Sequence, residues 1–497
     1  MTGKSVDYLA FVGDPVFSVA FSKTTNDGKG TQPYSAVFNS DYSFTINTNV
    51  EIYTDDAPWF GDGTWTWTAL RSDAPLASAW WNISPLTGSM DTGNPASPYD
   101  MMATTSSTGP GWAVSYGFYD AGSSWDGDLT NHDQSYVYVT PAVDTVLADI
   151  TSLRAALKTA PLSSFVLAGA HDAGTYDMTK MKAVCDNANL LNAFKQMIVT
   201  YSAEGYISAA LAGLAGLMMS LDSSDSLKMV QDFAVTQKDD VSTLLDLGVR
   251  YFDFRPGYCA PSIRNGDNNI YHQHTCIPGV LYSDFMTDVF TWLTAHPNEI
   301  VVVSLNFQGF ADVTNMAPTV DALNSLTTAA QTAGCKGQAL INTGGLADLA
   351  TPYDTLISDN RRVIFLNQIA AAPASGRDTN STAKYDSYSD IYKTLDPSVI
   401  VAQLEKMTVA GQAGSDYTVM QLQATAQGVK SAAGDTVTDD SWSGSPLVAT
   451  KATCDAQTYP WLRANLRKNL GSAQLIVLLN NYADNALAFH TRLIMTS

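Results

Sequence analysis

From about residue 146 onward, the chain repeats one pattern: a short apolar run of strand length that ends in polar or charged residues. Segments with helical spacing separate the runs, such as Ser283–His296, which stops at Pro297. Strands that alternate with helices indicate a parallel sheet covered by helices, so we predict an α/β fold, an irregular (distorted) TIM β/α barrel over residues 146–497. The predicted strands lie at Phe165–Leu167, Val249–Arg255, Asn269–His274, Glu299–Leu305, Arg362–Asn367, Tyr417–Leu422 and Gln474–Asn480.

The polar residues at the ends of these strands are the first candidates for chemistry. In a parallel barrel the carboxyl ends of the strands meet at one rim, and active sites lie there. We therefore expect the following side chains to converge: His171, Asp253, Arg255, His274, Asn306 and Asn481.

The pair His171–Asp172 shows the pattern most sharply. The apolar run Phe165–Leu167 leads into a stretch of small residues, and glycines at 169 and 174 bracket the pair. Small residues let a substrate approach the backbone, and a histidine beside a carboxylate can transfer protons near neutral pH. Two interpretations stay open on this stretch alone: a catalytic histidine, or a strand followed by a turn that merely exposes His171.

The first 145 residues have a different character. They hold seven of the ten tryptophans, and polar and apolar residues alternate along Tyr42–Tyr53, Thr64–Thr68 and Ser135–Val139. Period-two alternation predicts strands with one buried face, so we expect an antiparallel β-sandwich at 1–145, ahead of the barrel at 146–497. The tryptophans fit either a core or an exposed surface that binds sugars or a membrane interface. They are Trp59, Trp65, Trp67, Trp80, Trp81, Trp112 and Trp125.

Charge and composition exclude several classes of function. The net charge of −21 argues against a basic stripe for nucleic acid and against electrostatic adsorption to an anionic bilayer. Neither a secretory signal nor a membrane-spanning segment is expected, since the longest apolar stretch, Tyr206–Leu221, is broken by Gly and Ser. A helical pair, Leu190–Val199 and Ile207–Leu221, fits a buried hairpin better than a lipid contact. The compartment stays open between cytoplasmic and processed secreted.

The five cysteines form no CxxC motif and suggest neither a disulfide scaffold nor a zinc site. A single Cys259–Cys276 bridge stays open.

Three motifs together resemble one family. Ala168–Thr175 is similar to a first-histidine motif of the form PGTHDSGT, with alanines where Pro, Thr and Ser are usual. Val235–Gln237 and Leu247–Arg255 resemble a TQ segment leading into a GARxFDxR strand, and Tyr271–His274 with His296–Leu305 resembles a second-histidine strand followed by HPxE and SL segments. These are features of the X-region of phosphatidylinositol-specific phospholipase C, especially the bacterial, metal-independent kind. The resemblance covers about residues 148–497.

The resemblance implies a role for each matched residue. His171 would be the general base, and His274 the general acid, supported by Asp172; His272 is the alternative acid. Arg255 would clamp the phosphate, and Asp253 would hold Arg255 or a histidine. The calcium-dependent branch of the family has an acidic residue where Arg255 stands, so we expect neither metal nor cofactor. Attack by a neighbouring hydroxyl would make the enzyme a phosphorus–oxygen lyase acting on a phospholipid or related phosphodiester.

The sequence departs from the family at several positions that would contact the base or the substrate. Asn481 stands where the family has an aspartate that pairs with the base, with Asp484 as the alternative partner. Asn306 stands for a lysine and Gln368 for an arginine. We count Asn306, Gln368, Asn481 and Tyr482 as candidate substrate-binding residues. The alternative function is a catalytically weakened barrel that binds a glycan or membrane, with the N-terminal sandwich as the binding module.

Overall fold

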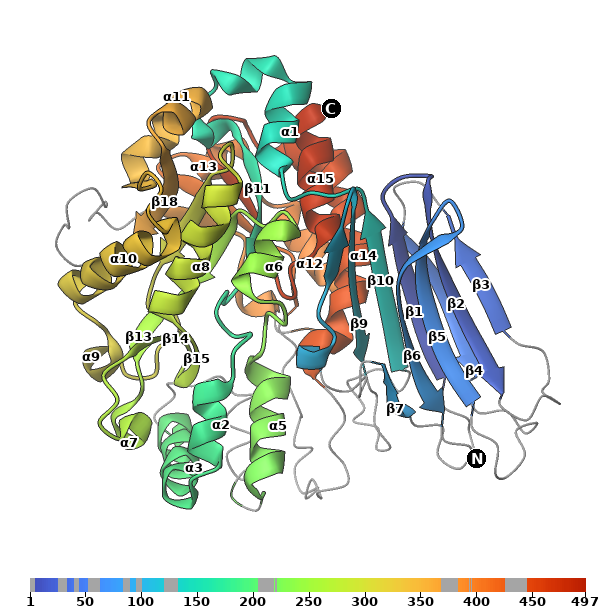
Figure 1. Ribbon diagram of the computed structural model, residues 1–497, viewed down its shortest axis with the longest axis horizontal. Coiled ribbons are helices and arrows are strands. Elements are labelled where there is room, and N and C mark those ends of the chain that lie inside the picture. The colour runs from blue at the N-terminus through green and yellow to red at the C-terminus, as the bar shows by residue number, and fades with distance from the viewer. Residues whose placement is uncertain are drawn as a thin grey trace.

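The computed structural model describes residues 5–25, 34–39, 44–51, 63–83, 90–94, 101–119, 133–203, 219, 221–367, 383–392, 394, 396–424 and 445–497. Three parts make up this structure: an eight-stranded parallel sheet, a small antiparallel sheet at its rim, and two five-stranded sheets built from the first 140 residues (Figure 1).

The eight-stranded sheet forms the barrel. Its strands are paired in the order β17-β18-β16-β12-β11-β21-β20-β19, and every pair is parallel. Among the described residues no pairing joins β17 to β19, so the barrel is distorted and open between them, which agrees with the predicted irregular TIM-type barrel. The bounds are β11 Val166–Ala170, β12 Tyr251–Phe254, β16 Val301–Leu305, β17 Asn342–Gly344, β18 Arg361–Asn367, β19 Lys384–Asp386, β20 Tyr417–Gln421 and β21 Ile476–Asn480.

Helices cover the outside of this sheet and bury its strands. The central strands consist almost wholly of apolar residues and are buried, as expected of parallel strands covered on both faces. The predicted helix Ser283–His296 is α8, and Leu190–Val199 lies within α3, whereas most of Ile207–Leu221 falls outside the described residues. The helices are α1 Val146–Leu153, α2 Thr179–Cys185, α3 Ala188–Ala203, α5 Ser223–Ala234, α6 Val241–Asp246, α7 Pro261–Arg264, α8 Tyr282–Ala295, α9 Val313–Met316, α10 Val320–Cys335, α11 Tyr353–Ser358, α12 Pro397–Leu404, α13 Val409–Gln412, α14 Pro446–Asn469 and α15 Asn485–Thr496.

The predicted strand Asn269–His274 is not a barrel strand. As β14 (Ile270–His274) it lies between β13 (Pro256–Tyr258) and β15 (Ile277–Leu281) in an antiparallel sheet. The loop after β11 crosses this sheet closely: Val280 N donates to Gly174 O at 2.8 Å, and a Cβ on Gly174 would lie 2.4 Å from Cβ of His272. The glycine at 174 therefore lets the first-histidine loop pack directly against the strand that carries the other two histidines.

The first 140 residues form two sheets that share one core. The sheets have the orders β4-β1-β10-β9-β8 and β3-β2-β5-β6-β7. Their pairs are antiparallel as predicted, except that β1 and β10 are parallel. The bounds are β1 Ser5–Val12, β2 Phe17–Thr25, β3 Tyr34–Phe38, β4 Phe44–Glu51, β5 Gly63–Arg71, β6 Ala74–Ile83, β7 Met90–Asn94, β8 Ser107–Gly109, β9 Trp112–Tyr119 and β10 Asp133–Thr140.

Most of the described tryptophans of these sheets belong to the core. Trp65, Trp67 and Trp81 are at most 1% exposed and pack between the sheets, so the core interpretation holds for them. Trp80 is 40% exposed. Trp59 and Trp125 lie outside the described residues.

The sheet that contains β1 and β10 also packs against the barrel. All eight residues of β10 are buried, because one face meets the other sheet and the opposite face meets helices of the barrel. Phe11 contacts the ring of Phe489 in α15, and Asn485 Nδ2 donates to Ala113 O at 2.9 Å. Figure 1 shows α14 and α15 between this sheet and the barrel strands. The predicted boundary between two domains at residue 145 stays a prediction.

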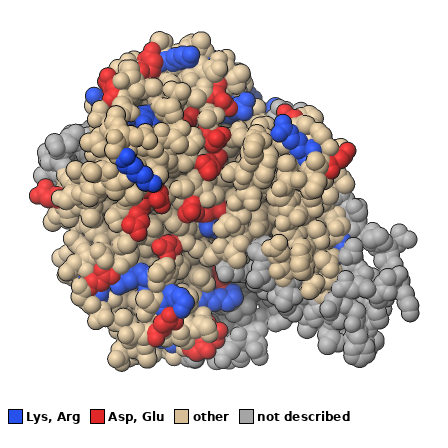
Figure 2. Space-filling model, viewed as in Figure 1, with Lys and Arg blue, Asp and Glu red and all other residues tan. Residues whose placement is uncertain are grey.

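Three other expectations concern thiols, membrane helices and charge. All five cysteines are free and buried, so the Cys259–Cys276 bridge that the sequence left open is not formed. No described helix combines the length and hydropathy needed to cross a membrane. Figure 2 shows acidic and basic side chains interspersed on the face in view, so the negative charge is not gathered in one patch there.

Candidate active site

The candidate site lies where the loop after β11 meets the ends of β12, β16 and β21 and the small antiparallel sheet. His171 and Asp172 follow β11, Arg255 follows β12 and Asn481 follows β21. Asp253 belongs to β12, and Asn306 follows β16. The structure therefore brings the predicted strand-end residues into one group, although the second histidine comes from a separate sheet.

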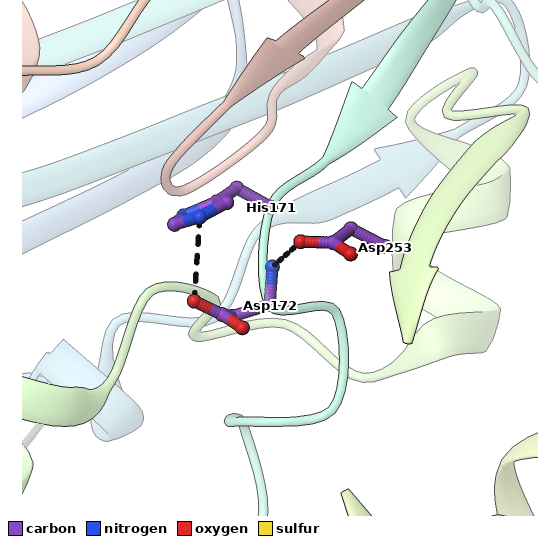
Figure 3. A group of neighbouring side chains, drawn as sticks. All are labelled: His171, Asp172 and Asp253. Carbon is purple, nitrogen blue, oxygen red and sulfur yellow. Dashed lines mark hydrogen bonds and ion pairs between the residues drawn. The ribbon is translucent and has the colours of Figure 1, made fainter. Parts of the chain in front are cut away.

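Asp172 is the centre of the group. Its side chain is fully buried, and its carboxylate oxygens lie 2.8 Å from Arg255 Nε and 3.8 Å from His274 Nε2. His171 Nε2 lies 3.3 Å from the same carboxylate (Figure 3). Burial alone would raise the pKa of Asp172, but the Arg255 guanidinium, aided by the two imidazoles, holds it well below its usual range. Asp172 is therefore an anion that lies beside one guanidinium and two imidazoles.

The backbone of Asp172 is held in an uncommon conformation. Its φ is 44°, in the left-handed region that residues other than glycine seldom adopt. Asp172 N lies 3.4 Å from Asp253 Oδ2, a contact drawn in Figure 3. Strained backbone persists only where the surroundings enforce it, and it is common at functional sites.

Arg255 joins the two aspartates and His171. Its Nη2 donates to Asp253 Oδ2 at 2.9 Å and lies 3.2 Å from His171 Nε2, while Nη1 donates to Gln308 O at 3.2 Å. Burial by itself would lower the pKa of Arg255, but the two carboxylates raise it, so the side chain stays charged. The planar guanidinium matches this arrangement because it offers donors in several fixed directions.

His171 faces Asn481 on one side and the charged group on the other. Its Nδ1 lies 2.9 Å from Asn481 Oδ1, and its side chain is 14% exposed. If Nδ1 carries the proton and donates to the amide oxygen, Nε2 keeps its lone pair and can accept a proton. The predicted pairing of Asn481 with His171 is therefore present in the geometry, and the exposed edge gives a substrate access.

The two histidines of β14 differ in access. His272 is fully buried, and its Nδ1 accepts a hydrogen bond from Arg255 N at 3.2 Å. His274 has a side chain that is 20% exposed, and its Nδ1 lies 3.0 Å from Ala234 O. That carbonyl fixes the proton on Nδ1 and leaves Nε2 to exchange protons. Burial lowers the pKa of both, and Asp172 offsets part of this effect.

The candidate substrate-binding residues have other partners. Asn306 is 3% exposed and donates through Nδ2 to Asp253 Oδ1 at 2.6 Å, so it orients that carboxylate. Tyr482 is 2% exposed, and its hydroxyl donates to Val235 O at 2.6 Å. Substrate contact by these two side chains stays a prediction that their burial does not favour. Gln368 lies outside the described residues.

Asp484 does not lie beside His171 as an alternative partner. Its carboxylate accepts a hydrogen bond from Leu487 N at 2.8 Å, as the N-cap of α15, and pairs with Lys451 at 2.6 Å. Asn481 is the residue of this turn that reaches the imidazole.

Two sets of residues near the site had no assigned role in the sequence. Gln237 Nε2 donates to His171 O at 2.9 Å, and Thr236 Oγ1 donates to the same oxygen at 2.9 Å. The matched TQ segment therefore holds the first-histidine loop. Lys384 in β19 lies 2.9 Å from Asp386 and donates to Gln308 Oε1 at 3.2 Å. No sequence motif marked Lys384, because barrel curvature alone brings it toward the site.

Three side chains could offer ligands to a metal ion. Ligand atoms of His171, Asp172 and Asp253 lie within 4.8 Å of one another. The guanidinium of Arg255, however, contacts all three, at 3.2, 2.8 and 2.9 Å. A metal ion would have to displace this organic cation, so the donor set fits a metal poorly.

Comparisons with known proteins point to one family. No protein-family model matches the chain. The chain is 34% identical over 85 residues to PI-PLC X domain-containing protein 1 of Homo sapiens, and 25% identical over 154 residues to the Danio rerio protein of that name. These alignments cover 17% and 30% of this chain but only 25% and 40% of the relatives.

Solved structures that match the chain include the phosphatidylinositol-specific phospholipase C of Listeria monocytogenes, with a TM-score of 0.40, 13% identity, and coverage of 72% of this chain and 99% of that one. The S. aureus enzyme of the same description gives a TM-score of 0.38 and 15% identity, with coverage of 70% and 99%.

Proposed function

We propose that the chain is a member of the PI-PLC X-domain family, to which its matched relatives belong, and that it cleaves phosphodiesters as a phospholipase C-like enzyme. The observation that carries the proposal is the grouping of two accessible imidazoles, His171 and His274, with the Arg255 guanidinium around one buried carboxylate. Cleavage of a phosphodiester needs a base, an acid and a cation at the phosphate, and this group supplies all three.

In the proposed reaction, His171 Nε2 removes the proton from a hydroxyl of the substrate. The hydroxyl oxygen forms a bond to phosphorus, and the bond from phosphorus to the leaving alcohol breaks. His274 Nε2 gives a proton to that alcohol. Where the attacking hydroxyl neighbours the phosphate on the same molecule, the product is a cyclic phosphodiester.

Arg255 would meet the non-bridging oxygens. Its Nε and Nη2 bind the two aspartates and one Nη1 hydrogen binds Gln308 O, so the second Nη1 hydrogen would be the one to meet a phosphate. The two carboxylates and one guanidinium together carry a net charge of −1. An anionic phosphodiester therefore binds best when His274 is protonated, which is also the state that a general acid requires.

We propose that the reaction needs no metal ion. The support is the guanidinium, which already contacts all three side chains of the ligand group found among the described residues. A positive charge placed by the protein can stabilise the developing charge on phosphate as a metal ion would.

Phosphorus NMR tests the proposal most directly. The full chain is incubated with phosphatidylinositol, a glycosylphosphatidylinositol, lysophosphatidylcholine and sphingomyelin, with and without EDTA. We expect a cyclic phosphate from at least one substrate in both conditions, and none with His171→Ala or His274→Ala. His296→Gln, a histidine stacked on Trp292 away from the site, is the matched control and should retain activity. Full turnover by His171→Ala would overturn the assignment.

The alternative proposal is a barrel that binds a phospholipid surface or glycan without turnover. The specific observation in its favour is Asn481, since an amide stabilises an imidazolium less than a carboxylate does. On the N-terminal sheets, Trp80 is the described tryptophan exposed enough to stack on a sugar or enter a membrane interface. Binding of glycans or vesicles by the full chain, weakened by Trp80→Ala, with no turnover on any substrate would favour this alternative.

A further inference from the structure

The turn that carries Asn481 is held at each of its residues. Asn480 O accepts a hydrogen bond from His171 N at 3.1 Å, and Tyr482 N donates to Thr236 O at 2.6 Å. Ala483 N donates to Gln237 Oε1 at 3.0 Å. Tyr482 has a φ of 46°, which is unfavourable for a residue with a side chain. A turn that includes such a residue keeps its shape only if its surroundings impose it.

A buried charged cluster lies under this turn. Lys451 Nζ contacts Asp455 Oδ2 and Asp484 Oδ2, both at 2.6 Å, and all three side chains are at most 1% exposed. Tyr459 OH donates to Asp484 Oδ2 at 3.1 Å. Buried charges are costly unless their partners are well placed, so a cluster of this kind specifies one geometry for the elements that carry it.

The side chain of Asn480 connects the cluster to the turn. Its Nδ2 donates to Asp455 Oδ1 at 2.8 Å and lies 2.9 Å from Tyr459 OH. Asn480 is the residue directly before Asn481, and its backbone oxygen accepts from His171 N. A shift of Asn480 would therefore move two of the partners of His171, Asn480 O and Asn481 Oδ1.

The N-terminal sheets reach the same cluster from the other side. Tyr138 in β10 donates its hydroxyl to Asp455 Oδ2 at 3.1 Å. Asn485 Nδ2, at the start of α15, donates to Ala113 O at 2.9 Å and Thr140 Oγ1 at 2.9 Å. All three contacts are buried, so this sheet fixes the helices that hold the turn.

We propose that Asp455 is a positioning residue for the base and acts on His171 through Asn480 and Asn481. Tyr138 extends this chain of hydrogen bonds into the N-terminal sheets. The inference rests on the proposed function. It assigns the N-terminal sheets a structural part in the active site, in addition to any surface that they present to a partner.

The test uses Asp455→Asn in the full chain. The substitution keeps the side-chain shape, removes one charge and leaves Lys451 paired with Asp484. We expect kcat to fall about tenfold with KM within about twofold, because small displacements of catalytic groups cost rate more than binding. The acidic limb of the pH–rate profile should also shift. Tyr138→Phe, which removes only a hydroxyl, should produce a smaller change in the same direction.

Glu299→Gln is the matched control. Glu299 pairs with Arg250 at 2.8 Å, both side chains are 1% exposed, and the pair lies at the opposite end of the barrel strands. We expect this control to lower Tm without changing kcat or the pH profile. If Asp455 had a purely structural role, Asp455→Asn would also lower Tm without changing kcat or the pH profile, and that result would overturn the inference.

A second readout separates this inference from the proposed function. The chain has six histidines, so the imidazole nitrogens of His171 can be followed by NMR after assignment with His171→Ala. Asp455→Asn and Tyr138→Phe should each move the His171 nitrogen signals, whereas Glu299→Gln should not. If the unaltered chain cleaves none of the substrates, the proposed function fails and the NMR result still decides the positioning role. Unchanged His171 signals in both variants would overturn it.

Discussion

Asn481→Asp tests the base and its partner in a single substitution. In the structure Asn481 Oδ1 lies 2.9 Å from His171 Nδ1, and the side chain of Asn481 is 2% exposed. The substitution changes an amide into a carboxylate of nearly the same shape at this position. It therefore adds a negative charge at hydrogen-bonding distance from the ring and leaves the packing almost unchanged.

The size of the change in the pH–rate profile follows from the hydrogen bond between residue 481 and His171. A hydrogen bond to a charged group contributes about 1.5–3 kcal/mol. If the carboxylate stabilises the imidazolium by that amount, the acidic limb of the pH–rate profile moves upward by about one to two pH units. Repulsion from Asp172 and Asp253 works against ionisation of the new carboxylate, so we expect the lower end of this range. Above the new limb, kcat should rise about tenfold, because the imidazolium formed during attack is better stabilised.

The assay is the rate of phosphodiester cleavage between pH 5 and 9, measured under single-turnover conditions. Asn481→Leu removes the hydrogen bond at similar volume and should lower kcat. Asn306→Asp is the matched control, because it adds a carboxylate beside Asp253, at 2.6 Å from Oδ1, without contacting His171. We expect that control to reduce activity. An unchanged pH profile in Asn481→Asp, together with wild-type activity in Asn481→Leu, would refute the role of His171 as the base.

Three further predictions concern Arg255, His490 and the thiols. Arg255→Lys should lower kcat/KM about a hundredfold, because an ammonium cannot contact Asp172, Asp253 and phosphate together. EDTA should leave the unaltered enzyme active, and a strict Ca²⁺ requirement would contradict the role of Arg255. Burial lowers the pKa of His490 to about 4, below the usual value of 6.5 in the unfolded chain. The neutral, buried imidazole therefore contributes fully to the free energy of unfolding above pH 6.5. This contribution, about 3 kcal/mol, is lost as the pH falls toward 4. Urea unfolding should show that His490→Phe loses less free energy of unfolding between pH 7 and 5 than the unaltered chain does. An equal loss in the two proteins would contradict the reasoning. Burial raises the pKa of the Cys276 thiol to about 12, and all five thiols are buried and free. In the native protein they should therefore react slowly with a disulfide reagent, and a reductant should leave Tm unchanged. Rapid labelling of the thiols would contradict their burial.

Much of the site was predictable because its signals are local. An apolar run that ends in His171–Asp172 is encoded within a few residues, and so is the Asp253–Arg255 strand end. Because parallel strands all end at one rim, their order along the chain was enough to predict that these side chains meet. The choice of His274 over His272 was also favoured by its place at the strand end. In the structure the His274 side chain is partly exposed and that of His272 is buried, and the choice stays a prediction.

Other parts of the site depend on contacts between distant segments. Whether Asn481 or Asp484 would meet His171 could not be decided from their spacing. The turn after β21 takes its shape from Thr236 and Gln237, far away in the sequence, and from the charged cluster buried beneath it. The placement of β14 in a separate sheet was missed for a similar reason. Its apolar pattern is that of a strand, and periodicity does not specify which strand it pairs with.

The sequence by itself determined which residues could do chemistry and that they lie at strand ends, because hydrophobic period and strand length are properties of short segments. Only the tertiary structure decided what surrounds each one. It placed Asp172 at the centre and Arg255 between two carboxylates, and it put Asn481 against the proposed base. It also packed the N-terminal sheets against the helices beneath the turn that carries Asn481. The contacts of Asn481 and of the N-terminal sheets join residues 310 to 372 positions apart. They arise from barrel curvature and packing, which no local pattern records.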